Sequence, residues 1–175
     1  MNWELEAVDK LEEQETYGEA LGKLYALWQG NPADEKLLIR LGFLAWYVIV
    51  EWPLIPHKDL AYKDFEGVLH EVTTYGLKHM SDSKAFNWVM GYMISLFPYH
   101  FGDYEEKEKQ GVAMLEKAHH MDEDDPIIKM LYLGHQHKSH PEAYREACQR
   151  SKVLISERFK GCGALASYFR EVLDR

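Results

Sequence analysis

The chain has 175 residues, of which 46% are apolar and 13% aromatic, so it holds enough apolar surface to offset the conformational entropy lost on folding. Its formal net charge of −9 argues against general nucleic-acid binding, because phosphate contacts need clustered Lys and Arg. Its two cysteines, Cys148 and Cys162, are too few for a disulfide framework and form no C-x-x-C zinc pair. We predict one folded domain over residues 1–175.

The first residues and the longest apolar run both bear on localisation. Residues 1–6 lack the basic and apolar segments of a signal peptide. The longest near-continuous apolar run covers residues 41–50, about half the length needed to span a bilayer. We therefore expect a cytoplasmic protein without a membrane partner, in which residues 41–50 form a buried core helix.

Charge is distributed unevenly along the chain. Residues 1–35 carry nine acidic and two basic side chains, whereas residues 126–175 carry five acidic and nine basic ones. An acidic region of this kind attracts a basic partner, and the residues predicted to form the acidic face are Glu12, Glu13, Glu15 and Glu19. The alternative is that the charge only keeps the chain in solution.

Capping signals separate helices in the first part of the chain, where apolar residues recur at spacings of three and four. Thr16 and Glu19 have the spacing of a capping box, in which the hydroxyl accepts from a first-turn N–H and the carboxylate reaches back. They are predicted to open a helix that Gly30 ends. Asn31 followed by Pro32 predicts the next helix start, with Asn31 as the N-cap.

The central part of the chain continues this pattern. The helix with the long apolar run must end before Pro53, and an inserted loop near residues 51–58 follows it. After a further helix, Ser81 or Ser83 is predicted to cap a helix that runs to Pro98.

The last part of the chain repeats the same signals. A helix is predicted to begin near Tyr104, another at Asp125-Pro126, and another at the second capping box in residues 139–142. Two glycines within residues 161–163 break the chain before a capping helix near 164–173. These signals predict an all-α protein of about nine helices in antiparallel pairs.

Small and large residues also recur at the spacing of a helical repeat. The matching positions are Ala20, Leu24, Leu27, Pro32, Leu38, Leu41, Gly42 and Ala45, and later Gly111, Leu115 and Ala118. In these motifs, over about two-thirds of its length, the chain resembles the tetratricopeptide-repeat family. The spacings between Val8, Gly42, Gly91 and Gly134, however, are 34, 49 and 43 residues, not a constant 34.

The resemblance implies a short right-handed solenoid of helix pairs whose groove binds a protein or peptide. The spacing leaves two alternatives open, another helical array and a closed helical bundle. Small residues at the repeat positions are expected to let helix backbones approach closely.

Metal and cation sites find little support in the sequence. His135, His137 and His140 lie close together, but side chains at i and i+2 on a helix point about 200° apart. The pairs Glu66–His70 and Glu116–His120 lack a third ligand. The acidic run at residues 122–125 precedes Pro126 and lacks the alternating acids of a calcium loop, so it is interpreted as a helix cap. We predict no metal and no cofactor.

The sequence gives no better support to a catalytic function. No phosphate-binding loop, G-x-S-x-G elbow or H-E-x-x-H motif is present. Cys162 stands between two glycines ahead of a helix, a place where a thiol can be activated, but a turn is the simpler interpretation. We predict that the chain is not an enzyme and has no catalytic residue.

Aromatic residues are the remaining candidates for binding, because they bury much area at low entropic cost. Those predicted to contact a partner are Tyr47, Trp52, Tyr92, Tyr99, His100 and Phe101. The last three follow Pro98 in a predicted loop. The alternative for each is a place in the core.

The predicted function is a non-catalytic protein–protein interaction module, an adaptor or regulatory binding protein. One alternative is an acidic immunity or inhibitor protein that neutralises a basic toxin or enzyme, since electrostatic steering makes such capture fast. A second alternative is a sensor that binds a peptide or a small ligand. The sequence makes no prediction of oligomeric state.

Overall fold

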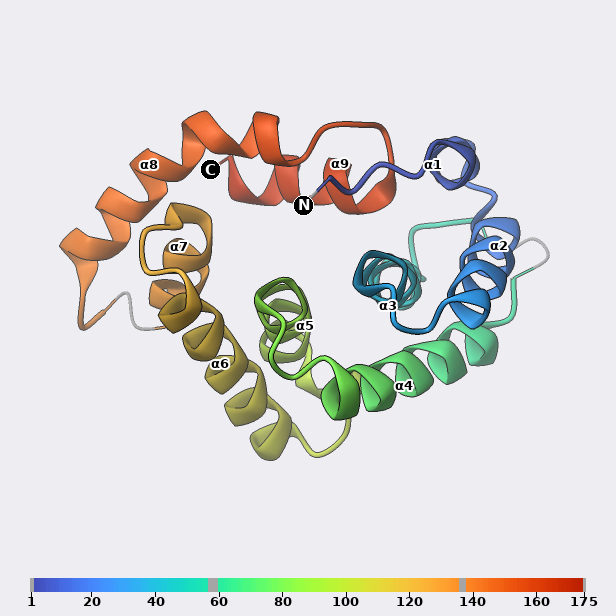
Figure 1. Cartoon of the computed structure of the whole chain (residues 1–175), viewed down its shortest axis with the longest axis horizontal. Coiled ribbons are helices and arrows are strands. Elements are labelled where there is room, and N and C mark those ends of the chain that lie inside the picture. Colours follow the sequence, from blue (N-terminus) through green and yellow to red (C-terminus); the bar gives the residue numbers. More distant parts are fainter. Residues whose placement is uncertain (1, 57–59, 136–137, 175) are drawn as a thin grey trace. The chain divides into compact units, whose positions relative to one another are not determined.

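A computed structural model describes residues 2–56, 60–135 and 138–174. Within these residues the chain forms nine α-helices and one short 3-10 helix, and no strand (Figure 1). The all-α prediction is confirmed. The elements are α1 (Glu6–Glu13), α2 (Tyr17–Gly30), α3 (Glu35–Val50), α4 (Tyr62–His79), α5 (Lys84–Leu96), η1 (Pro98–His100), α6 (Tyr104–Met121), α7 (Pro126–Gly134), α8 (Pro141–Arg158) and α9 (Ala164–Leu173).

The chain packs as two compact units. Unit 1 comprises residues 1–80 and 159–169, and unit 2 comprises residues 81–158 and 170–175. The single domain, the solenoid and the closed bundle all stay predictions. None of the helices in the described ranges is long and apolar enough to cross a membrane.

The core of unit 1 is built on α3, which packs against α2 and α4 (Figure 1). As predicted for residues 41–50, this helix is buried, and Phe43 and Trp46 are at most 1% exposed. The Phe43 ring centroid lies 5.7 Å from that of Phe169, which stacks on Phe159 at 5.1 Å. Aromatic packing thus fixes residues 159–169 on α3.

A buried charge cluster lies beside this aromatic core. The Arg40 guanidinium donates to the backbone oxygen of Trp3 at 2.6 Å and to the Glu12 carboxylate at 2.8 Å. It also pairs with Asp9 at 2.8 Å. Glu12 accepts the N–H of Ala164, the first residue of α9, at 2.6 Å. One guanidinium therefore links α3 to α1, to the segment before α1 and, through Glu12, to α9.

Unit 2 is a series of helices in which α5 packs on α6, α6 on α7 and α7 on α8. At the α5–α6 crossing, a Cβ atom added to Gly111 would lie 2.8 Å from the Ser95 Cα and 2.9 Å from the Gly91 oxygen. The two backbones approach so closely that only glycine fits at position 111. The expected close approach at this small residue is confirmed.

Two predicted caps are confirmed. The Asp125 carboxylate accepts from the N–H groups of Ile127 and Ile128 at 3.0 and 3.2 Å, with Pro126 opening α7. The Ser83 hydroxyl, rather than Ser81, accepts from Phe86 at the start of α5. These residues satisfy first-turn N–H groups that the helix leaves unpaired.

Two other predicted helix caps, Thr16 and Asn31, are wrong. Thr16 precedes α2 as predicted, but its hydroxyl donates to the Leu11 oxygen at 2.9 Å and accepts no first-turn N–H. Asn31 ends α2, since its N–H bonds to the oxygens of Leu27 and Trp28. The N-cap of α3 is Asp34, and α3 begins at Glu35.

Candidate functional site

The site begins at the tight turn between α1 and α2. The oxygens of Lys10, Leu11 and Glu12, in the last turn of α1, accept the N–H groups of Gln14, Thr16 and Glu15 at 3.2, 2.9 and 3.0 Å respectively. Glu15 has φ = +56°, a left-handed conformation that non-glycine residues seldom adopt. Hydrogen bonds on both sides of Glu15 hold it in this conformation.

A cavity of about 560 Å³ lies in unit 1 beside this turn. Its volume is within the range of known ligand sites, roughly 300–1,000 Å³. Three lining side chains from α2 and α4, Tyr17, Leu21 and Phe65, are buried, with exposed fractions of 6%, 7% and 1%. The cavity therefore has an apolar floor. The complete lining is Gln14, Glu15, Thr16, Tyr17, Gly18, Glu19, Leu21, Pro56, Leu60, Ala61, Asp64 and Phe65.

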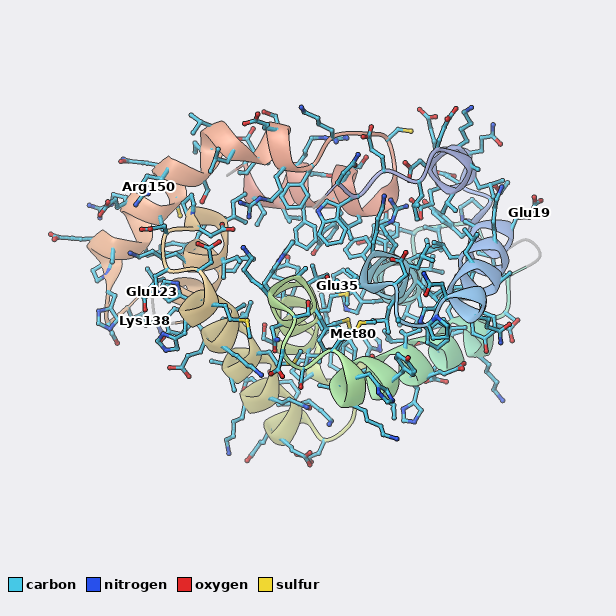
Figure 2. All side chains as sticks on the ribbon, viewed as in Figure 1. Glu19, Glu35, Met80, Glu123, Lys138 and Arg150 are labelled. Carbon is cyan, nitrogen blue, oxygen red and sulfur yellow. The ribbon has the colours of Figure 1, made fainter. Side chains whose placement is uncertain are left out.

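Carboxylates surround this floor. Glu15 comes from the turn, Glu19 from α2 and Asp64 from α4, and all three are exposed. Figure 2 shows the Glu19 side chain on the side of α2 away from α3. No Lys, Arg or His stands among the described residues that line the cavity. The three carboxylates themselves attract a cation.

Two of these carboxylates can also stabilise the helices to which they belong. Glu19 and Asp64 lie in the first turns of α2 and α4, where negative charge is stabilised by the helix dipole. Glu15 lies outside any helix, in a sparsely populated backbone conformation. Helix stabilisation alone thus does not account for all three carboxylates.

The Tyr17 hydroxyl in the floor is uncharged at physiological pH, as a tyrosine ordinarily is. Burial raises the pKa of the Tyr17 hydroxyl far above its ordinary value, and the neighbouring Tyr47 and Glu15 add to this shift. The Tyr17 ring packs edge-on against that of Tyr47, with centroids 6.1 Å apart. A bound cation would thus meet carboxylates at the rim and neutral apolar groups beneath.

No protein-family model, curated protein or solved structure matches this chain. Its function is therefore inferred from its own residues and their geometry.

Of the four residues of the predicted acidic face, three are exposed and one is buried. Glu13, Glu15 and Glu19 are exposed, and the last two line the cavity. Glu12 is wrong as a surface residue, because its side chain is 1% exposed and paired with Arg40. Burial raises the pKa of Glu12, and the charge of Arg40 opposes that shift. Glu12 cannot contact a partner without leaving this pair.

Two of the predicted partner-binding aromatics belong to unit 1. Tyr47 is half-buried, and its ring stacks on Phe43 at 6.1 Å besides its contact with Tyr17. Trp52 is half-buried and its ring lies 5.1 Å from that of Tyr62. Neither residue lines the acidic cavity.

The other predicted aromatics belong to unit 2. Residues 98–100 form the short helix η1 instead of a loop. Tyr99 is 57% exposed and its ring lies 4.3 Å from that of His100. His100, Phe101 and Tyr92 are half-buried, so among these four Tyr99 alone presents most of its ring to solvent.

The candidate metal ligands do not converge in the part of the chain that the structure describes, where no group of three or more His, Cys, Asp or Glu could hold an ion. His137 lies outside the described residues. In the acidic run, Asp122 pairs with Lys84 at 2.6 Å. Asp125, besides capping α7, pairs with Arg158 at 2.8 Å.

Cys162 is exposed, but its surroundings do not activate it. Burial, together with the carboxylates of Glu13 and Asp9, raises the pKa of its thiol. A nucleophilic cysteine needs the opposite shift, because the thiolate is the reactive form. The structure thus gives no support to a catalytic role for Cys162.

The sequence analysis missed the floor of the site and one of its carboxylates. Tyr17, Leu21 and Phe65 resemble any other core residues in an apolar pattern, and Asp64 lies far along the chain from Glu15 and Glu19. The fold alone brings them together.

Proposed function

We propose that this protein is a non-catalytic binding protein that takes a Lys or Arg side chain of another protein into the acidic cavity. The observation that carries the proposal is the combination of an apolar floor at Tyr17, Leu21 and Phe65 with a rim of three carboxylates. Lys and Arg match both parts, because their aliphatic stems pack on apolar surface while their charged ends stay polar.

The charge of the whole chain supports the same partner. A formal net charge of −9, with nine acidic side chains in residues 1–35, steers a basic protein toward this part of the chain. The resemblance to tetratricopeptide repeats, which implies protein binding, agrees with this proposal. An adaptor and an inhibitor of a basic enzyme or toxin would use the cavity in the same way, and they differ in whether the partner loses activity when bound.

The test is affinity capture of partners from lysate of the protein's own cells at low and high salt. A rim variant carries Glu15→Gln, Glu19→Gln and Asp64→Asn. A control variant carries Glu66→Gln, Glu105→Gln and Glu157→Gln, three exposed residues outside the cavity, so its net charge changes by the same amount. We expect the rim variant to weaken binding of a basic partner roughly tenfold, since three rim contacts each contribute modestly.

The control separates local contacts from overall charge. We expect the control variant to bind within about twofold of wild type, since screening limits the effect of distant surface charges. Equal losses in both variants would mean that only net charge matters. Unchanged capture by the rim variant would refute the proposed site.

A further inference from the structure

Unit 2 holds a second cavity, of about 330 Å³, with a character unlike the first. It lies among α5, α7, α8 and the last residues of α9, which belong to this unit. Met130, Leu131 and Leu173 form buried apolar walls, each at most 9% exposed. The cavity is thus a hollow in the packing of the helices, large enough for a small molecule.

Polar groups in its walls are already engaged with one another. The Ser95 hydroxyl donates to the Tyr92 oxygen at 3.0 Å. Tyr144 and Cys148 lie one turn apart on α8, and their side chains form a hydrogen bond. Burial is the larger cause, and this hydrogen bond the smaller one, of the raised pKa of the Tyr144 hydroxyl. A ligand would therefore meet mainly apolar surface, with few hydrogen-bonding groups to satisfy.

The described residues that line this cavity are uncharged at pH 7. No Asp, Glu, Lys or Arg stands among the lining residues that the structure describes. Desolvation lowers the pKa of the exposed His135 imidazole, and the nearby Glu108 opposes that shift, so the ring is neutral at pH 7. An ion placed here would lose hydration without gaining a counter-charge, which strongly disfavours it.

We propose that this cavity binds a small uncharged, mainly apolar molecule, such as an aromatic ring system or a short alkyl chain with one hydrogen-bonding group. The volume accommodates roughly ten to fifteen non-hydrogen atoms, judged from about 30 Å³ for a water in the liquid. The site is separate from the acidic cavity, and it does not depend on the proposed capture of a basic protein.

The chain contains its own reporter for this site. Cys148 lines the cavity, whereas Cys162 is exposed in unit 1 and lines neither cavity. The probe is 1-naphthylamine, an uncharged fluorescent aromatic amine that is small enough for this volume. Its matched control is 1-naphthylamine-4-sulfonate, which has the same ring system with an anionic group. Iodoacetamide labels both thiols, and mass spectrometry of the digested protein reads the rate at each cysteine.

We expect 1-naphthylamine to slow the labelling of Cys148 about tenfold at ten times its Kd, because only the unoccupied fraction reacts. The rate at Cys162 should stay unchanged, and the sulfonate should protect Cys148 far less. Equal protection of both cysteines would indicate non-specific coating and refute the site. An equal labelling rate of Cys148 with and without the probe would also refute the site. So would a Cys148 that iodoacetamide does not label even when the probe is absent, or equal protection of Cys148 by the sulfonate.

A pair of variants on α8 confirms the location. Cys148→Phe fills the cavity, whereas Val153→Phe adds the same ring at a position that is 75% exposed and outside the lining. We expect probe fluorescence to fall at least tenfold in the first variant and to be retained in the second. Equal fluorescence in both would overturn the assignment. Circular dichroism checks that each variant is folded, and the labelling of wild type tests the site even if Cys148→Phe does not fold.

Discussion

Two pairs of carboxylates lie within a few residues of each other and have opposite surroundings. Asp9 and Glu12 are buried against Arg40, whereas Glu15 and Glu19 are exposed at the rim of a cavity. The first pair joins α1 to α3, and the second faces solvent. Acidic residues that are close in sequence can therefore have different roles, because the groups that face each carboxylate determine what it does.

The largest effect is expected from removing the cation that holds the buried pair. Arg40→Met leaves two buried carboxylates without a counter-ion, so we expect a loss of about 3–5 kcal/mol in the free energy of unfolding. Urea unfolding followed by circular dichroism measures it. A loss below about 1 kcal/mol would mean that the cluster is accessible to water and is no different from the rim.

A smaller loss is expected from Glu12→Gln, about 1–2 kcal/mol at neutral pH, because Arg40 keeps its pairing with Asp9. The pH dependence of this stability difference shows whether the ionisation of Glu12 causes it. The pKa of Glu12 is raised above 4.5 in the folded state, so its contribution is fully present below that pH and is lost as the pH rises through the folded pKa. Wild type should therefore gain stability relative to the variant as the pH falls from 7 toward about 4.5. Parallel pH profiles would contradict this assignment.

Glu15→Gly is expected to stabilise the chain by about 0.5–1 kcal/mol. Glycine removes the cost of the left-handed conformation, about 1–2 kcal/mol, and part of that gain is offset by its greater freedom in the unfolded chain. Thermal unfolding measures the change. A stability gain together with weaker capture of the partner would show that the strained residue serves binding, whereas a loss of stability would show that the turn needs the glutamate.

The smallest effect on stability is expected from the full rim variant, Glu15→Gln, Glu19→Gln and Asp64→Asn, within about 0.5 kcal/mol of wild type. Urea unfolding provides the measurement, with the Glu66, Glu105 and Glu157 variant alongside. A loss above about 1.5 kcal/mol would indicate that the rim carboxylates are structural, like the buried pair.

Local chemistry explains which elements the sequence could predict. Asp125 before Pro126 and Ser83 cap their helices as expected, since a cap depends only on its own first turn. Thr16 and Asn31 failed because their polar groups bond backward to oxygens of the preceding helix, three to five residues earlier, instead of forward to the next helix. Leu27, a position of the repeat pattern, is 44% exposed, although Leu24 is fully buried.

The site was less predictable, because it depends on distant residues. Glu15 and Glu19 could be proposed from the acidic run, but the same run suggested Glu12, whose buried partner Arg40 is 28 positions away. Asp64 and Phe65 join the cavity only through the packing of α4. Charge in a sequence predicts that a partner is attracted, and only the fold determines which carboxylates can reach it.

The bond between Glu12 and the N–H of Ala164 spans 152 positions of the chain. Unit 1 is consequently discontinuous, with the sequence of residues 81–158 lying between its two parts. During synthesis, α1 and α3 leave the ribosome long before α9 does. A nascent chain therefore cannot complete the Arg40 cluster until Ala164 has also been translated, so the contact between Glu12 and the Ala164 N–H forms after the other contacts of the cluster.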